Sequence, residues 1–329
     1  MERFNYASYY GPIGPLADAL RENPERFWTP TKEELAQPHE YILYLGCNVL
    51  RTTHLAESIV AVLKAMKADF IAMGGSTYCC GIVQQWAGDA EAGLKIGQKT
   101  LNTFGQSGAK AVLVYCPTCE LVFDEKLASG ALKFDLPYQH VIKYIAEHLD
   151  RFPFKKPLRR RVALHMHMGT AQARRDSEHV LSILRAIPEL EVVELPAGEE
   201  WGYACTPVIM EKIGADRHRA MVAAMVDTAK SSGCDAVVSV YHICYRELLS
   251  VEQDFGVEWL NYVELLTPAL EIGPFPPRYK ELFLGGNVEA AFATLAPRAA
   301  ERGVSSDSLR RAVDVHFRPG ASPVSIKRV

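Results

Sequence analysis

The sequence has 329 residues, of which 48% are hydrophobic and 23% charged; this composition predicts folded domains with a sizeable core and excludes global disorder. The formal charge of −3 provides no electrostatic footprint for nucleic acid. The first residues lack the apolar core of a signal peptide, and no apolar run approaches the roughly 20 residues of a membrane span. We therefore expect a cytoplasmic protein without a transmembrane segment. Its eight cysteines are then expected to stay reduced and to serve metal binding or catalysis.

The chain opens with an extension, residues 1–39, in which Thr31 and Glu34 form a Thr-x-x-Glu arrangement that predicts the start of a short helix. Apolar runs and helical periodicity then alternate. They predict strands at 41–45, 70–73 and 111–115 and helices at 53–67 and 89–104. This order indicates a parallel sheet covered on both faces.

Five cysteines follow these three strands in the spacing C-x31-CCG-x34-C-x2-C. They are Cys47, Cys79, Cys80, Cys116 and Cys119. The carboxyl ends of parallel strands lie at one edge of a sheet, which is where open α/β sheets bind their ligands. Thiols on three separate loops suit a soft metal, either zinc or an iron–sulfur cluster. We interpret Gly81, directly after Cys80, as a residue whose missing Cβ lets such a group approach the backbone.

The second half of the chain repeats the first. A shift of 125 residues takes Ala111-Val112 to Ala236-Val237 and Cys119 to Cys244, and a shift of 121 takes the strand at 41–45 to 162–166. The repeat predicts a second α/β unit after a linker that contains the basic run Arg159-Arg160-Arg161.

The repeated unit has lost most of its thiols. Met168, Ala204 and Tyr241 stand where Cys47, Cys79 and Cys116 would be, and only two of the five cysteines persist. Histidines lie near these positions, so the sequence leaves two interpretations of one residue group: His165, His167, Cys205, His242 and Cys244. They could bind a second metal or form a metal-free polar pocket near the axis between the units. We expect the pocket, because the joint loss of three ligand positions indicates an abandoned site.

We accordingly predict an α/β protein of two tandem, pseudo-twofold-related units with parallel sheets, plus N- and C-terminal extensions. The expected segments are an extension at 1–39, a unit with the complete motif at 40–150, a degenerate unit at 151–264, and a second extension at 265–329. Nothing in the residues indicates the role of either extension. We interpret Cys234, whose counterpart is Ala109, as a core residue.

The spacing of the five cysteines, nearly repeated in tandem over about residues 40–260, resembles the CCG (cysteine-rich) domain family. Its members include the cysteine-rich subunit of heterodisulfide reductase and related components of sulfur-oxidising complexes. The resemblance implies a non-cubane [4Fe-4S] cluster held by the five cysteines at 47, 79, 80, 116 and 119. The substitutions in the second unit depart from the family pattern and argue against a second cluster.

The resemblance also implies a function. We expect an iron–sulfur subunit of a heterodisulfide-reductase-like complex, an oxidoreductase acting on thiol or disulfide sulfur, free or delivered on a carrier. Its implied partners are a ferredoxin-like iron–sulfur subunit and a flavoprotein. The alternative is a zinc- or cluster-bearing anchor or electron-relay subunit of a dehydrogenase without catalysis of its own. The substrate, the direction of electron flow, the oligomeric state and the catalytic residues do not follow from the sequence.

Overall fold

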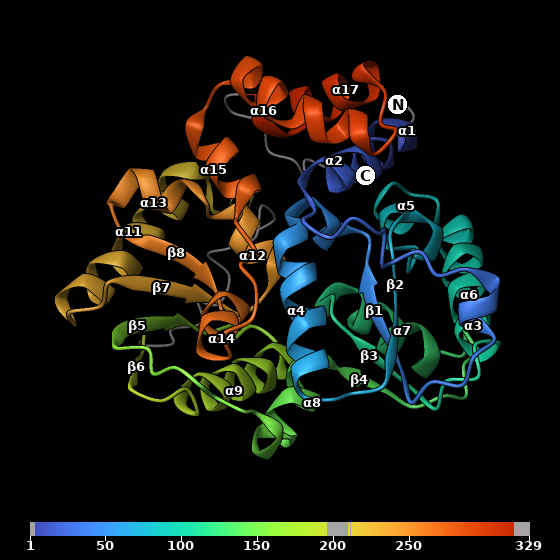
Figure 1. The fold of residues 1–329 in the computed structure, drawn as a ribbon, viewed down its shortest axis with the longest axis horizontal. Helices are drawn as coiled ribbons and strands as arrows, with labels where there is room; N and C mark the ends of the chain where they lie inside the picture. Colours follow the sequence, from blue (N-terminus) through green and yellow to red (C-terminus); the bar gives the residue numbers. More distant parts are fainter. Residues whose placement is uncertain (1–3, 196–209, 211, 319–329) are drawn as a thin grey trace. The chain divides into compact units, whose positions relative to one another are not determined.

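The computed structural model describes residues 4–195, 210 and 212–318. Their helices include none that is long and apolar enough to cross a membrane. The chain divides into two compact units (Figure 1). The first takes in Met1–Glu57, Ala68–Val141 and Pro277–Val329, and the second Ser58–Lys67 and Ile142–Pro276.

The first unit contains four strands among short and long helices. In chain order its elements are α1 (Tyr6–Tyr10), α2 (Ile13–Leu20), α3 (Lys32–Leu35), β1 (Tyr41–Gly46), the 3₁₀ helix η1 (Asn48–Thr52), the start of α4 (Thr53–Ala65), β2 (Phe70–Gly74), η2 (Ser76–Tyr78), α5 (Ile82–Trp86), α6 (Ala90–Gly105), β3 (Ala111–Val114), α7 (Pro117–Ala128), β4 (Tyr138–His140), α15 (Arg278–Gly285), α16 (Val288–Glu301) and α17 (Ser306–Phe317). The predicted capping box at Thr31 and Glu34 begins α3.

The four strands form one parallel sheet in the order β2-β1-β3-β4. The connection from β1 to β2 runs in one direction along the sheet and the connections from β2 to β3 and from β3 to β4 run in the other. Right-handed crossovers therefore place α4 on one face and α6 and α7 on the opposite face. The sheet is covered on both sides, as its unbroken apolar strands require.

An aromatic cluster fills the space between the sheet and helices α6 and α7. Tyr44 of β1 lies 5.0 Å from Phe104 and 5.8 Å from Phe123, measured between ring centroids. All three side chains are at most 1% exposed. The phenol of Tyr44 donates a 2.7 Å hydrogen bond to the carbonyl oxygen of Tyr78, so this cluster also holds the segment that precedes the paired cysteines.

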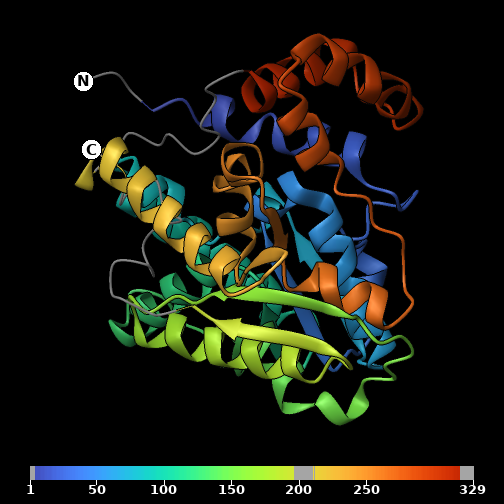
Figure 2. The ribbon, with the colours of Figure 1, turned by 90° about the vertical axis from the view of Figure 1, so that its left-hand side faces the viewer.

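The terminal helices of the first unit pack on one another, with α2 against α16 and α17 (Figures 1 and 2). Arg298 and Arg302 donate hydrogen bonds to the carbonyl oxygen of Arg21, which caps the carboxyl end of α2. Cations at this end of a helix are favoured by its dipole and by its unpaired carbonyls. Arg298 and Arg278 also pair with Glu22, each at 2.7 Å, so residues early and late in the chain form one polar network.

The second unit repeats the arrangement of the sheet. Its elements are α8 (Val141–Glu147), η3 (Leu149–Arg151), β5 (Arg160–His165), α9 (Ala171–Arg185), β6 (Leu190–Glu194), α11 (Ala215–Ser231), β7 (Ala236–Ser239), α12 (His242–Glu247), α13 (Ser250–Phe255), β8 (Glu258–Asn261) and α14 (Val263–Ala269). The strands are parallel in the order β6-β5-β7-β8, so the predicted α/β class with two parallel sheets is confirmed.

Strand register supports the repeat inferred from the sequence. Tyr41 pairs with Ala111 in the first sheet, and Val162 pairs with Ala236 in the second. These are the positions related by the shifts of 121 and 125 residues. The two units therefore share one topology and one register between their central strands.

Glu22 should give the first unit a pH-dependent stability. Burial raises the pKa of this carboxyl, but its hydrogen bonds with Arg278 and Arg298 outweigh burial and hold the pKa below its usual value of 4.5. A carboxyl whose pKa is lower in the folded than in the unfolded protein stabilises the fold at pH values above its unfolded pKa. This contribution to stability is lost as the pH falls. We expect Glu22→Gln to lower the free energy of unfolding by about 1 kcal/mol at pH 7.

The difference from the unsubstituted protein should shrink as the pH falls below 4.5, measured as urea midpoints followed by circular dichroism. Glu91→Gln is the control, because the pair of Glu91 with Lys95 is exposed on α6 and its loss should shift the midpoint less. A difference for Glu22→Gln that stays constant with pH would contradict this assignment.

Candidate functional site

The five cysteines of the motif lie at the carboxyl edge of the first sheet, as predicted. Cys47 follows β1 and caps the start of η1, and Cys79 and Cys80 follow β2 and η2. Cys116 follows β3 and caps the start of α7, with Cys119 in the first turn of that helix. Three neighbouring parallel strands thus deliver all five residues to one place.

The five thiols form a continuous group of hydrogen-bonded sulfurs. Cys79 contacts Cys47 and Cys80, Cys80 contacts Cys119, and Cys119 contacts Cys116. Each of the five is at most 8% exposed, and all are free thiols. The structure therefore brings every predicted ligand residue of the first unit together in a buried position.

The thiol of Cys79 has a strongly lowered pKa. Hydrogen bonds from the thiols of Cys47 and Cys80 lower the pKa of Cys79 to about 3, against the effect of burial. The amide of Gly81 also donates to this sulfur at 3.4 Å. The hydrogen bond of Cys47 to Cys79, together with burial, raises the pKa of Cys47 well above its usual range. Hydrogen bonds to Cys116 and Cys80 do the same for the pKa of Cys119.

This donor set fits an iron–sulfur cluster. Thiolates are the ligands of such clusters, and five buried thiols on one sheet edge offer more sulfur donors than the four of a tetrahedral structural zinc site. In the metal-free chain the raised pKa values keep most of these thiols protonated, so binding of a metal must release protons. Ligation by the five cysteines remains a prediction.

Two glycines permit close packing around the thiol group. A Cβ on Gly46, whose φ is +72°, would lie 3.1 Å from the Cβ of Cys116 and 3.2 Å from the sulfur of Cys119. Gly81, with φ +88°, has a reason in addition to the one that the sequence suggested. A Cβ there would lie 2.0 Å from the carbonyl oxygen of Gly93 in α6. Gly81 therefore permits the paired-cysteine loop to pack on α6.

Helix α6 presents a row of small residues to that loop. A Cβ on Gly97 would lie 2.8 Å from the carbonyl oxygen of Cys80, and the hydroxyl of Thr100 donates to the carbonyl of Cys79 at 2.8 Å. Gly93, Gly97 and Thr100 recur at the four- and three-residue steps that share one helix face. Sequence reasoning missed this signal, although the spacing made it detectable.

Sequence reasoning also missed a contact from the N-terminal extension. The hydroxyl of Tyr10, the last residue of α1, lies 3.2 Å from the sulfur of Cys79 and donates to the side-chain oxygen of Gln84 at 3.3 Å. A partner 69 residues away from Cys79 has no local pattern that would have indicated it.

The second unit places its remaining polar residues at the corresponding sheet edge. The sulfur of Cys244 lies 3.1 Å from Nε2 of His167, and the ring centroids of His165 and His167 are 4.9 Å apart. Tyr241 caps the start of α12 as Cys116 caps α7, and its hydroxyl donates to Asp176 at 2.7 Å. The structure thus groups His165, His167 and Cys244, and buries them.

Two further residues of the expected second group have separate outcomes. His242 begins α12 and is buried. Cys205, like Ala204, lies outside the residues that the structure describes. Whether this group binds metal therefore stays a prediction.

Cys234 is 7% exposed and precedes β7, consistent with a core residue.

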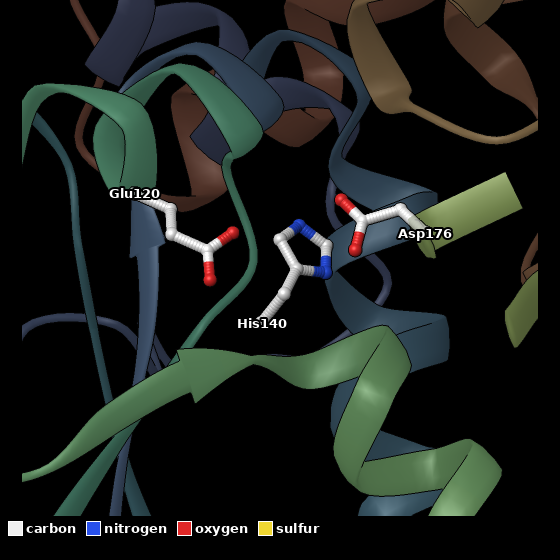
Figure 3. A group of neighbouring side chains, drawn as sticks. All are labelled: Glu120, His140 and Asp176. Atoms are coloured by element: carbon white, nitrogen blue, oxygen red, sulfur yellow. The ribbon is translucent and has the colours of Figure 1, made fainter. Parts of the chain in front are cut away.

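Figure 3 shows a pair that the sequence did not single out, Glu120 of α7 and His140 of β4, whose potential ligand atoms lie within 4.8 Å of one another. Asp176, drawn in the same view, belongs to α9 of the second unit. A glutamate and a histidine supply only two of the three or four protein ligands of a typical zinc site. We assign this pair no metal.

A family model described as CCG, cysteine-rich domain, matches residues 41–124 and 164–248, just over half of the chain. The first range contains all five clustered cysteines, and the second contains His165, His167 and Cys244. No curated protein matches the chain.

Several solved structures match the chain at low identity and with TM-scores below 0.5. A hypothetical protein from Helicobacter pylori matches at 11% identity and TM-score 0.48, covering 79% of this chain and 57% of that one. An aspartate racemase homologue from Pyrococcus horikoshii OT3 matches at 16% identity and TM-score 0.31, covering 70% of this chain and 97% of that one. Glutamate racemase from Francisella tularensis in complex with D-glutamate matches at 14% identity and TM-score 0.30, covering 74% of this chain and 86% of that one. Similarity at this level carries no information about activity.

Gly81→Ala tests the packing of the paired-cysteine loop. The added Cβ meets the backbone of α6, and the residue must keep a left-handed conformation, so we expect a loss of about 1–3 kcal/mol of stability. Gly105→Ala is the control, since a Cβ there meets nothing within 4 Å and alanine is favoured in helices by about 0.5–1 kcal/mol. Thermal unfolding followed by circular dichroism compares them; equal melting temperatures would refute this role of Gly81.

Proposed function

Because this chain belongs to the CCG family of cysteine-rich domains, we propose that it is the iron–sulfur subunit of a heterodisulfide-reductase-like complex. In this proposal it carries out redox chemistry at thiol or disulfide sulfur in the cytoplasm. The observation that carries the proposal is the continuous group of five buried thiols, drawn from three strand ends, in the first unit.

The cysteines at 47, 79, 80, 116 and 119 would hold a non-cubane [4Fe-4S] cluster. When bound, such a cluster supplies one-electron chemistry and a soft site for a sulfur ligand. The protein's own contribution is to bury the sulfurs and to aim hydrogen bonds at them. The amide of Gly81 donates to Cys79, and donors of this kind stabilise negative charge on sulfur and raise a reduction potential.

The net reaction in this proposal converts a disulfide, two electrons and two protons into two thiols, or runs in reverse. The electrons would be exchanged with a ferredoxin-like iron–sulfur subunit and, through it, with a flavoprotein. The substrate would be a free or carrier-bound thiol or disulfide. The second unit, with its altered residues at three cysteine positions, would hold no second cluster.

The alternative is a non-catalytic anchor or electron-relay subunit of a dehydrogenase that carries zinc or a cluster. One observation favours it: all five thiols are buried, and structural metal sites are closed whereas catalytic sites keep a position open. Redox turnover of the assembled complex with small disulfides would separate a catalyst from an anchor.

Metal content tests the proposal directly. Purified without oxygen, the protein should contain about four irons per chain with matching acid-labile sulfide and no zinc. Cys80→Ala and Cys119→Ala remove buried members of the sulfur group and should lose the iron. Cys234→Ala removes another buried thiol that lies outside the group, and its iron content should be unchanged.

Stoichiometric zinc without sulfide would refute the cluster. Unchanged iron in Cys80→Ala would refute the ligand assignment. Twice the expected iron per chain, the content of two such clusters, would show that the second unit also binds one.

The polar group of the second unit gives a separate prediction. The triple change of His165, His167 and His242 to Ala should leave total metal unchanged, because we propose a metal-free pocket there. Turnover or partner binding should fall if the pocket serves substrate. Loss of a second metal from this variant, measured by mass spectrometry of the metals, would show that the pocket is a metal site.

A further inference from the structure

The N-terminal segment approaches the thiol group with two consecutive aromatic residues, Tyr9 and Tyr10, at the end of α1. Their rings meet edge to face at 4.9 Å. Tyr10 reaches the sulfur of Cys79, and Tyr9 reaches Arg51. Cys79 is itself a cluster ligand in the proposed function, and Arg51 follows another proposed ligand, Cys47, by four residues.

The hydroxyl of Tyr10 is positioned to donate to Cys79. The two atoms are 3.2 Å apart, and a thiolate can only accept. The side-chain oxygen of Gln84, a residue that is 6% exposed, lies 3.3 Å from the same hydroxyl. Rotation of its amide by 180° turns an N–H toward the phenol oxygen, because the amide carries a donor and an acceptor. Gln84 can then donate to Tyr10 while Tyr10 donates to the sulfur.

Arg51 places a buried positive charge next to α1, where it contacts Tyr9. It lies in η1, four residues after Cys47, and is 1% exposed. Its guanidinium donates to the side-chain oxygen of Asn48 at 2.6 Å and to the carbonyl of Tyr9 at 3.1 Å, with its carbon 4.8 Å from the ring centroid of Tyr9.

These partners do not neutralise the guanidinium. Over residues 4–195, 210 and 212–318, no carboxylate forms an ion pair with Arg51, and its Nε has no hydrogen-bond partner. Burial of an uncompensated charge is strongly unfavourable. Arg51 acts electrostatically on Cys47, four residues away, and favours its thiolate form.

We propose that Tyr10 and Arg51 are positioning residues of the redox centre: the phenol donates a hydrogen bond to Cys79, and the guanidinium is the counter-ion of the anionic thiolate group. The N-terminal segment is then part of the centre. This inference rests on the proposed function, in which the five cysteines hold a redox-active cluster. Reduction adds a negative charge, which both groups stabilise, so together they raise the reduction potential.

The test is a redox titration of the holoprotein followed by electron paramagnetic resonance. Tyr10→Phe keeps the ring and removes the donor. We expect iron content to be retained and the equilibrium constant for reduction to fall about tenfold, the effect of a hydrogen bond to a charged group, which is about 59 mV for a one-electron couple. Tyr138→Phe is the matched control, because that hydroxyl donates to the carboxylate of Asp124 and its loss should leave the potential unchanged.

Arg51 is tested with a pair of variants. Arg51→Met removes the charge and should lower the potential or lose the iron, whereas Arg51→Lys keeps the charge and should recover much of the loss. If Arg51 had a purely structural role, the reduction potentials of the two variants would not differ according to their charge. Equal potentials in Arg51→Met and the unsubstituted protein would overturn the counter-ion assignment.

A second measurement does not depend on potentials. In deuterated buffer, electron–nuclear double resonance should detect an exchangeable proton coupled to the cluster that is absent from Tyr10→Phe. If the unsubstituted protein holds a cluster but neither its potential nor this coupling changes in Tyr10→Phe, the inference about Tyr10 is wrong and the proposed function stands. If the unsubstituted protein contains no iron or sulfide, the proposed function itself fails.

Discussion

Parallel pairing of β1 with β2 on one side and β3 on the other is the constraint on which the sulfur group depends. Parallel strands end at the same edge of a sheet, so residues 47, 79–80 and 116, far apart in sequence, follow strand ends that are neighbours in space. A change of strand order would separate them even if every cysteine were kept. The register between β1 and β3, reproduced between β5 and β7, explains how the second unit retains the same architecture after losing most of the thiols.

Strand order alone does not shape the loop that carries the paired cysteines. That loop is held on one side by α6, where Gly81 and Gly93 meet without side chains and Thr100 bonds the carbonyl of Cys79. Tyr44 of β1 fixes the preceding carbonyl of Tyr78. The sulfurs are thus set by backbone contacts to a rigid helix and strand, and rigid supports of this kind limit the rearrangement that accompanies a change of charge.

Much of the fold was predictable because its signals are local. Apolar runs indicated β1, β2 and β3, helical spacing indicated α4 and α6, and the Thr31–Glu34 pair indicated the start of α3. The positions of the cysteines followed from those strands. The contacts of Tyr10 and Arg51 were not predictable, since they depend on how α1 and η1 pack and leave no periodic trace in the sequence. The contact of Gly81 with Gly93 was not predictable for a related reason, because Gly93 lies on another element.

The hydrogen bonds at the carboxyl end of α2 join residues that are synthesised at widely different times. Arg298 binds the carbonyl of Arg21 across 277 residues of chain, and Arg302 does so across 281. At a translation rate of about 5–20 residues per second, the ribosome needs on the order of tens of seconds to supply these partners after α2 has emerged. During synthesis the sheet and its cysteines therefore precede the two arginines that bind the carboxyl end of α2. The packing of α2 on η1 joins segments that are synthesised early, whereas the bonds from Arg298 and Arg302 are added at the end.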